Sequence, residues 1–227
     1  MREVVLDTET TGLEAHEGDR IIEIGGVELI NHIPSGKSFH VHVNPECEIS
    51  QGAFAIHGLS TEFLREKPVF AEIADDFIAF IADSPLIIHN AEFDANFLNS
   101  EFERLGRRKI PRKRLIDTLY IARQRHPKGP NSLDALCRRY NVDNSGREKH
   151  GALLDAELLA ELYIDLIGAR EPHLTLVAEA SAPARAERGV KTRPHPLPER
   201  ISQTEREAHK LFVEELGAAA IWNDYPE

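Results

Sequence analysis

Asp7 and Glu9 follow directly after an apolar, β-branched run at residues 2–6. Side chains two residues apart on a strand share a face, so both carboxylates are expected to point the same way. Two carboxylates at the end of a buried strand repel each other and lose hydration, which is unfavourable unless a cation lies between them. Mg²⁺ prefers oxygen ligands and is a natural candidate. An Asp-x-Glu alone more often marks two solvated acids at a strand end, and the residues downstream change that balance.

Asp94, His150 and Asp155 occupy comparable places further along the chain. Each is expected just before or within the first turns of a helix, where an acid can also serve only to complement the helix dipole. In an open α/β sheet such strand and helix ends converge on one edge, where ligands bind. Four acids and a histidine gathered there predict a two-metal hydrolytic site, in which His150 can accept a proton at neutral pH.

The elements that must position these residues follow from hydrophobic periodicity. Strands are predicted at residues 2–6, 20–30, 38–43, 85–88 and 115–120, and the first three should form an antiparallel meander with a hairpin loop at 31–36. Helices are predicted at residues 68–82, 93–105, 131–140 and 202–216, with a further one that carries Asp155 and ends near residue 167. Residues 46–67 are expected to be irregular. The pattern indicates an α/β fold.

Three features of the sequence each have two possible interpretations. Glu23 is either an acid of the site or, as we favour, a structural residue of its strand. His57, beside Gly58 and two aliphatic residues, is either a packed loop residue or a wall of a substrate cleft. The basic run at residues 104–128, in which Asp117 is the single acid, is either a solvated face or a surface for a phosphate backbone.

Composition sets the outer bounds. The chain has 227 residues, of which 41% are hydrophobic and 29% charged, and this is typical of a globular protein with one sizeable core plus a tail. A net charge of −11 argues against a bulk nucleic-acid coat protein. Cys47 and Cys137 form no metal motif, which favours the reducing cytoplasm. We expect no signal peptide and no membrane span.

A change of composition near residue 170 predicts three regions. Residues 1–170 are expected to form the catalytic domain, residues 171–200 a Pro-containing flexible linker, and residues 201–227 a helical tail. Ser202 and Glu205 have the spacing of a capping box at the start of the tail helix. The apolar residues expected to bind a partner are Leu211, Phe212, Leu216, Ile221 and Trp222.

Three segments carry a resemblance to a known family: Asp7–Gly12, His89–Asp94 and His150–Asp155. In this order and spacing they resemble the three motifs of the DEDDh 3′–5′ exonucleases, over roughly residues 3–168. The resemblance is closest to the proofreading subunits of bacterial DNA polymerase III. It implies a ribonuclease H-like fold, with a mixed five-stranded sheet flanked by helices.

The resemblance also implies roles for individual residues. Two divalent ions, Mg²⁺ or Mn²⁺, would be bound directly by Asp7, Glu9 and Asp155 and through water by Asp94. His150 matches the general base. The terminal nucleotide would be held by Thr10, Thr11, Gly12 and His57, with Asn90 and Phe93 as weaker assignments to the same pocket.

The implied function is removal of 3′-terminal deoxynucleotides from single-stranded or frayed DNA ends. The implied partner is the DNA polymerase III alpha subunit, bound through the tail; the sliding clamp and a small accessory subunit are further candidates. Two alternatives remain: an RNA-trimming DEDDh exoribonuclease, which would use the same five residues, and a non-enzymatic scaffold with an inactive nuclease core. The linker and tail favour proofreading, because a free-standing RNA exonuclease needs no tether.

Overall fold

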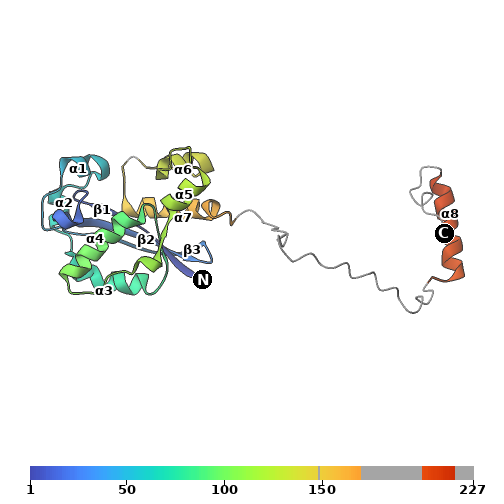
Figure 1. Cartoon of the computed structure of the whole chain (residues 1–227), viewed down its shortest axis with the longest axis horizontal. Coiled ribbons are helices and arrows are strands. Elements are labelled where there is room, and N and C mark those ends of the chain that lie inside the picture. Colours follow the sequence, from blue (N-terminus) through green and yellow to red (C-terminus); the bar gives the residue numbers. More distant parts are fainter. Residues whose placement is uncertain (148, 170–200, 218–227) are drawn as a thin grey trace, which may run out of the picture. The chain divides into compact units, whose positions relative to one another are not determined.

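The computed structural model describes residues 1–147, 149–169 and 201–217. The chain divides into two compact units, residues 1–173 and residues 174–227. Figure 1 shows the first unit as a sheet with helices on both sides, and α8, Gln203–Leu216, within the second. No helix among the described residues is long and apolar enough to cross a membrane.

The first unit is built on a mixed five-stranded sheet with the strand order β3-β2-β1-β4-β5. The bounds are Arg2–Thr10 for β1, Ile21–Ile30 for β2, Ile33–His42 for β3, Leu86–Ile88 for β4 and Leu115–Asp117 for β5. The first three strands are antiparallel neighbours, while β4 runs parallel to β1 and β5 parallel to β4. This confirms the predicted fold class and meander.

Helices cover both faces of the sheet, each over its own apolar core. The helices of the first unit are α1 Gln51–His57, α2 Thr61–Arg65, α3 Phe70–Ile81, α4 Ala91–Arg104, α5 Thr118–Arg125, α6 Leu133–Tyr140 and α7 Ala152–Leu166, with short 3-10 turns at Ala15–Glu17 and Arg112–Arg114. Val4 and Leu6 of β1 pack with α3 and α4 in one core. Val5 faces the other way and packs with α6 and α7 in the second core.

The structure corrects several predicted boundaries. The loop expected at 31–36 is a tight turn at Asn31 and His32, both with positive φ, and β3 begins at Ile33. Pro34 is accommodated because β3 is an edge strand. The strand expected at 115–120 ends at Asp117, whose side chain accepts hydrogen bonds from the first backbone amides of α5.

Residues 46–67, expected to be irregular, contain α1 and α2. Ser50 and Ser60 cap these helices by accepting backbone hydrogen bonds from Ala53 and Phe63. In the second unit, the capping box predicted at Ser202 and Glu205 is present. Residues 171–200, expected to form a linker, and Ile221 and Trp222 lie outside the described residues.

Candidate active site

The first two acids of the site come from one face of β1. Asp7 pairs with Gly25 and Glu9 with Glu23 on the antiparallel neighbour β2. A Cβ at Gly25 would collide with the backbone of Ala152 at the start of α7. The absence of a side chain at this position therefore lets α7 begin directly over the acids of β1, which is why Asp155 can join them.

Asp94 reaches the same strand end from the other side of the sheet. It lies in the first turn of α4 and is 3% exposed. Thr8, whose side chain points to the face of β1 opposite to Asp7 and Glu9, donates a hydrogen bond from Oγ1 to Asp94 Oδ1 at 2.7 Å. Thr8 thus holds the Asp94 carboxyl at the end of β1, a positioning role that the sequence analysis did not identify.

His150 and Asp155 complete the cluster. Possible ligand atoms of Glu9, His150 and Asp155 all lie within 4.8 Å of one another. His150 Nδ1 is 3.4 Å from Asp155 Oδ2, and the His150 backbone N–H donates to the carbonyl of Ile56 at 3.3 Å. The side chain of His150 is 47% exposed, so its ring borders both the acids and solvent. Local structure therefore brings together Asp7, Glu9, Asp94, His150 and Asp155.

Arg147 is a member of the site that sequence analysis missed. Its side chain is 6% exposed, and its guanidinium holds the Asp155 carboxylate at both oxygens, with Nε–Oδ1 2.5 Å and Nη2–Oδ2 2.6 Å. The same group contacts Asp134 Oδ1 at 2.7 Å and His150 Nδ1 at 2.8 Å. An arginine in a polar loop gives no periodic signal, and only the fold shows that it reaches three atoms of the cluster, on Asp155 and His150, in addition to Asp134.

Burial and mutual repulsion alter the proton affinities of these acids. The pKa of Asp7 is raised well above its usual value by loss of solvation, then by the charges of Asp94, Asp155 and Glu9. Burial raises the pKa of Glu9 to about 7, against the opposing effect of His150, and burial raises the pKa of Asp94 to about 7, against the Thr8 hydrogen bond. Three acids are therefore poorly compensated by the protein itself.

Asp155 differs from the other acids. Burial raises its pKa, but hydrogen bonds from His150 and Arg147 outweigh that effect and keep the pKa below the ordinary value. Conversely, the hydrogen bond to Asp155 raises the pKa of His150, against burial and the charge of Arg147. Buried carboxylates that lack compensating cations are a donor set suited to hard divalent ions, so the residues present fit such a metal.

A pocket of about 520 Å³ opens beside the acids. Among the predicted substrate residues, Thr10, Gly12, His57 and Phe93 line it. Residues that the sequence analysis did not single out also line it, the apolar ones being Leu13, Ala53 and Ile56. The last two belong to α1, a helix that was expected to be irregular chain, so its contribution to the pocket could not be foreseen.

His57 has an unusual environment within this pocket. It is 5% exposed, its Nδ1 accepts a hydrogen bond from the Leu59 backbone N–H at 3.0 Å, and its Nε2 has no hydrogen-bond partner among the described residues. Burial lowers the pKa of His57, so the ring is neutral. With Nδ1 as acceptor, the proton is on Nε2, which leaves a buried donor available to a ligand.

Two predicted substrate residues are absent from the residues that line the pocket. Thr11 is 1% exposed; its Oγ1 donates to Asp19 Oδ1 at 3.0 Å and accepts from the Arg20 backbone N–H at 3.0 Å, so it fixes the turn after β1. Asn90 is the left-handed N-cap of α4, and its backbone N–H donates to Asp117 Oδ1 at 3.2 Å. Both residues have structural contacts that account for their positions.

The basic run at 104–128 has several structural contacts. Arg107 pairs with Asp75 at 2.8 Å, and Arg114 donates to the carbonyls of Ile81 and Ser84. Arg114 directly precedes β5, whereas Asp94 follows β4, and β4 and β5 are parallel. These arginines therefore lie toward the opposite end of the strands from the acids, and a phosphate-binding role for the run stays a prediction.

The pKa shifts predict how metal affinity depends on pH. Glu9 and Asp94 hold protons up to pH about 7 in the folded chain, whereas the same carboxyls in an unfolded chain release them near pH 4. The free energy of unfolding of the metal-free chain should therefore fall as pH rises from about 4 to about 7. A metal must displace these protons. We expect Mn²⁺ affinity, measured by titration calorimetry, to rise about tenfold per pH unit for each proton released.

The matched control is Glu9→Gln, which removes one of the titrating carboxyls. It should bind Mn²⁺ more weakly and with a shallower pH dependence between pH 5 and 7.5. An affinity that does not change with pH over this window in the unsubstituted protein would contradict the assignment of Glu9 and Asp94 to the metal site.

Comparisons with known proteins agree with this geometry. The family model described as Exonuclease (RNase_T) matches residues 4–163. A protein of Rickettsia felis named DNA polymerase III subunit epsilon is 46% identical over 222 residues, covering 95% of this chain and 97% of the relative. The protein of the same name from Escherichia coli K12 is 49% identical over 175 residues, covering 74% and 72%. The solved structure of exonuclease X in complex with 5′-overhanging duplex DNA is similar at a TM-score of 0.58 and 27% identity, covering 74% of this chain and 92% of that one.

Proposed function

The chain belongs to the exonuclease family, as a 3′–5′ proofreading exonuclease of the DNA polymerase III epsilon type, and we propose that its acidic cluster removes 3′-terminal deoxynucleotides by two-metal hydrolysis. The family generally uses divalent metals. The observation that carries the proposal is the convergence of Glu9, His150 and Asp155 within 4.8 Å, beside a pocket in which the buried His57 Nε2 has no partner within the described part of the chain.

Each residue of the cluster has a proposed role. Asp7, Glu9 and Asp155 would hold two divalent ions, Mg²⁺ or Mn²⁺, directly, with Asp94 acting through water. When bound, such ions stabilise negative charge that develops at the scissile phosphate. Arg147 and His150 fix the orientation of the Asp155 carboxylate. His150 borders solvent, so it is placed to take a proton from an attacking water and pass it to bulk.

The pocket is proposed to hold the terminal nucleotide. Leu13 and Ile56 offer apolar surface to a base, and the Nε2–H of His57 can donate to an oxygen of the nucleotide. Gly12 is required here because a Cβ would collide with the Asp19 carboxylate, whose other contacts fix the turn. A pocket on this scale takes one nucleotide that has left its stack.

The substrate experiment compares three 3′ ends on otherwise identical strands: paired, mismatched and RNA. Mismatched ends should be cut faster than paired ones, because unpairing and unstacking a terminal base costs a few kcal/mol. DNA should be preferred to RNA. Equal rates on paired and mismatched ends, or preference for RNA, would favour the alternative of an RNA-trimming enzyme.

The tail is proposed to bind the DNA polymerase III alpha subunit. Leu211, Phe212 and Leu216 on α8 are exposed within their own unit. A helix this short is marginal in water by itself, so a partner surface would stabilise it. Ile221 and Trp222, proposed as further anchors, lie outside the described residues. The sliding clamp and a small accessory subunit are further proposed partners, and association with a bacterial replicative polymerase would place the chain in the cytoplasm.

Deletion of residues 200–227 should abolish binding to the alpha subunit while cleavage of free single-stranded DNA continues at the rate of the full chain. The reason is that the acids and pocket all lie in the first unit, while α8 lies in the second. Pull-down of both forms with the alpha subunit is the measurement. Equal recovery of the truncated and full-length chains would place the binding surface on the first unit.

A further inference from the structure

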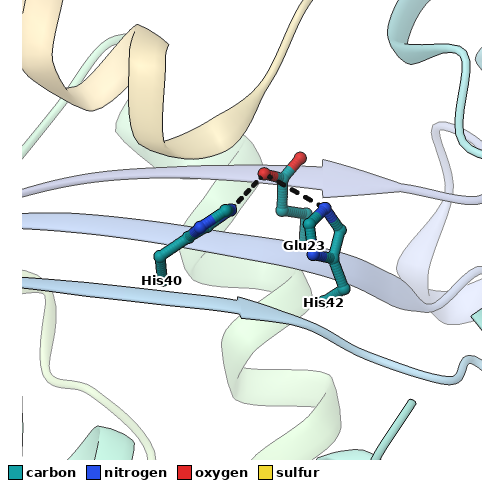
Figure 2. A group of neighbouring side chains, drawn as sticks. All are labelled: Glu23, His40 and His42. Carbon is teal, nitrogen blue, oxygen red and sulfur yellow. Dashed lines mark hydrogen bonds and ion pairs between the residues drawn. The ribbon is translucent and has the colours of Figure 1, made fainter.

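Three potential metal ligands gather outside the acidic cluster: Glu23 on β2 and His40 and His42 on the edge strand β3. Figure 2 shows both imidazoles turned toward the same carboxylate. His40 Nε2 lies 2.7 Å from Glu23 Oε1, and His42 Nε2 lies 3.6 Å from the same oxygen. Ligand atoms of all three residues lie within 4.8 Å of one another.

Strand register explains the gathering. A His-x-His sequence on a strand places both rings on one face. Glu23 is the direct partner of His42 across the β2–β3 ladder, and His40 is opposite Gly25. Because Gly25 has no side chain, no neighbouring group on β2 separates the His40 ring from Glu23. The arrangement is therefore fixed by three backbone positions and does not depend on a flexible loop.

An ion pair alone accounts for only part of this cluster. Glu23 is 5% exposed, and one protonated histidine would suffice to neutralise it. His42 Nε2 lies 3.6 Å from the same Glu23 oxygen that His40 contacts, so a second imidazole converges on one carboxylate. Two imidazoles aimed at one carboxylate oxygen are the arrangement expected of metal ligands.

The other side chains around Glu23, His40 and His42 mainly pack against the cluster. Phe63 meets the His42 ring edge-on, with centroids 5.1 Å apart, and the Lys67 ammonium lies over the Phe63 ring at 4.1 Å. Glu9 is the register partner of Glu23 on the β1 side. The side chains of His40 and His42 are 37% and 25% exposed, so an ion held here would keep at least one position open to water.

We propose that Glu23, His40 and His42 bind one transition-metal ion of the zinc class, separate from the ions of the acidic cluster. Two imidazole nitrogens and one carboxylate oxygen suit Zn²⁺, whereas Mg²⁺ takes oxygen ligands. Zinc bonds of about 2.0–2.1 Å in a tetrahedron separate ligand atoms by about 3.3 Å. The distances of 2.7 and 3.6 Å from Glu23 Oε1 lie on either side of that value.

Such an ion would join the edge strand β3 to the interior of the sheet. It would stabilise the folded chain in proportion to zinc concentration, because the unfolded chain does not hold the three ligands together. The inference does not depend on the proposed nuclease function, since none of the three ligands belongs to the proposed catalytic set.

The test uses the full chain with Asp7→Asn and Asp155→Asn, which removes the acidic cluster as a competing site. After dialysis against Zn²⁺ and then metal-free buffer, elemental analysis should find one zinc per chain. Adding His42→Gln should remove it, adding His42→Cys should restore it because a thiolate also binds zinc, and adding the exposed control His16→Gln should leave it unchanged. X-ray absorption should show two imidazoles on each zinc.

Thermal unfolding gives a second readout. Zn²⁺ should raise the melting temperature of the parent double variant and of His16→Gln, and should not raise that of His42→Gln. Equal zinc content in the parent and His42→Gln, an absorption spectrum with one imidazole or none, or a parent that binds no zinc would each overturn the proposal. We expect His42→Gln, made in the otherwise unsubstituted chain, to keep its nuclease activity, because the acidic cluster is intact in that variant.

Discussion

Replacement of Asp7 by asparagine is expected to reduce the rate of nucleotide release by about 10³-fold or more. Metal stabilisation of developing charge is worth several kcal/mol, and about 1.4 kcal/mol corresponds to a tenfold change in rate. Asp7 lies at the centre of the repulsive cluster, since Asp94, Asp155 and Glu9 all raise its pKa. Single-turnover cleavage of a labelled strand is the measurement, and Glu9→Gln and Asp155→Asn should have effects of the same order.

The melting temperature distinguishes a loss of catalysis in Asp7→Asn from misfolding. Removing one acid from a like-charge cluster relieves repulsion, so the melting temperature of Asp7→Asn without metal should stay level or rise. The matched control is Asp76→Asn on the exposed side of α3, which should change neither rate nor melting temperature. Full activity of the Asp7→Asn protein would contradict the assignment of the metal site.

Replacement of His150 by alanine should lower kcat by about 10²–10⁴-fold, with a much smaller change in KM, because general-base assistance is typically worth that much. At saturating Mg²⁺, where metal binding no longer depends on pH, the acidic limb of the pH–rate profile should disappear in the variant. His150 faces Glu9 and Asp155 and borders solvent, and this is the geometry that the role requires. A pH–rate profile identical to that of the unsubstituted protein would show that His150 only packs.

Lys149→Gln is the control for the position of the loop. Lys149 Nζ donates to the Ala55 carbonyl at 2.8 Å, and the His150 backbone donates to the neighbouring Ile56 carbonyl, so both residues tie the loop to α1. Lys149→Gln should therefore weaken the attachment of this loop to α1 while keeping the His150 imidazole. We expect it to keep the acidic limb of the profile.

The sheet could be predicted from sequence because β1, β2 and β4 contain buried apolar runs, and the strand directions follow from the connections between them. Val4, Val5 and Leu6 form one uninterrupted run because both faces of β1 are buried, in separate cores. The helices α1 and α2 escaped prediction because they are short and their large apolar residues Phe54, Ile56 and Phe63 are exposed, which leaves Leu64 as a single buried apolar position. Only the capping serines mark where they begin.

The five residues of the acidic cluster were identifiable because chemistry restricts the residue types and the strand and helix ends restrict their positions. Arg147 and Thr8 were not, because both act through a partner far away in sequence or on another element. Thr11 and Asn90 were assigned to the substrate pocket because they belong to the motifs. In the structure, each makes a hydrogen bond that fixes the local backbone, Thr11 with Arg20 and Asn90 with Asp117.

The most direct test of a metal-dependent 3′–5′ exonuclease built on Asp7 follows the first product from a single-stranded DNA labelled on its 3′-terminal nucleotide. With Mg²⁺ or Mn²⁺ the full chain should release the label at once as a nucleoside 5′-monophosphate, and Asp7→Asn or excess chelator should abolish this release. Release of the label only after the rest of the strand has been degraded, appearance of the label in longer fragments, or undiminished release by Asp7→Asn would contradict the account.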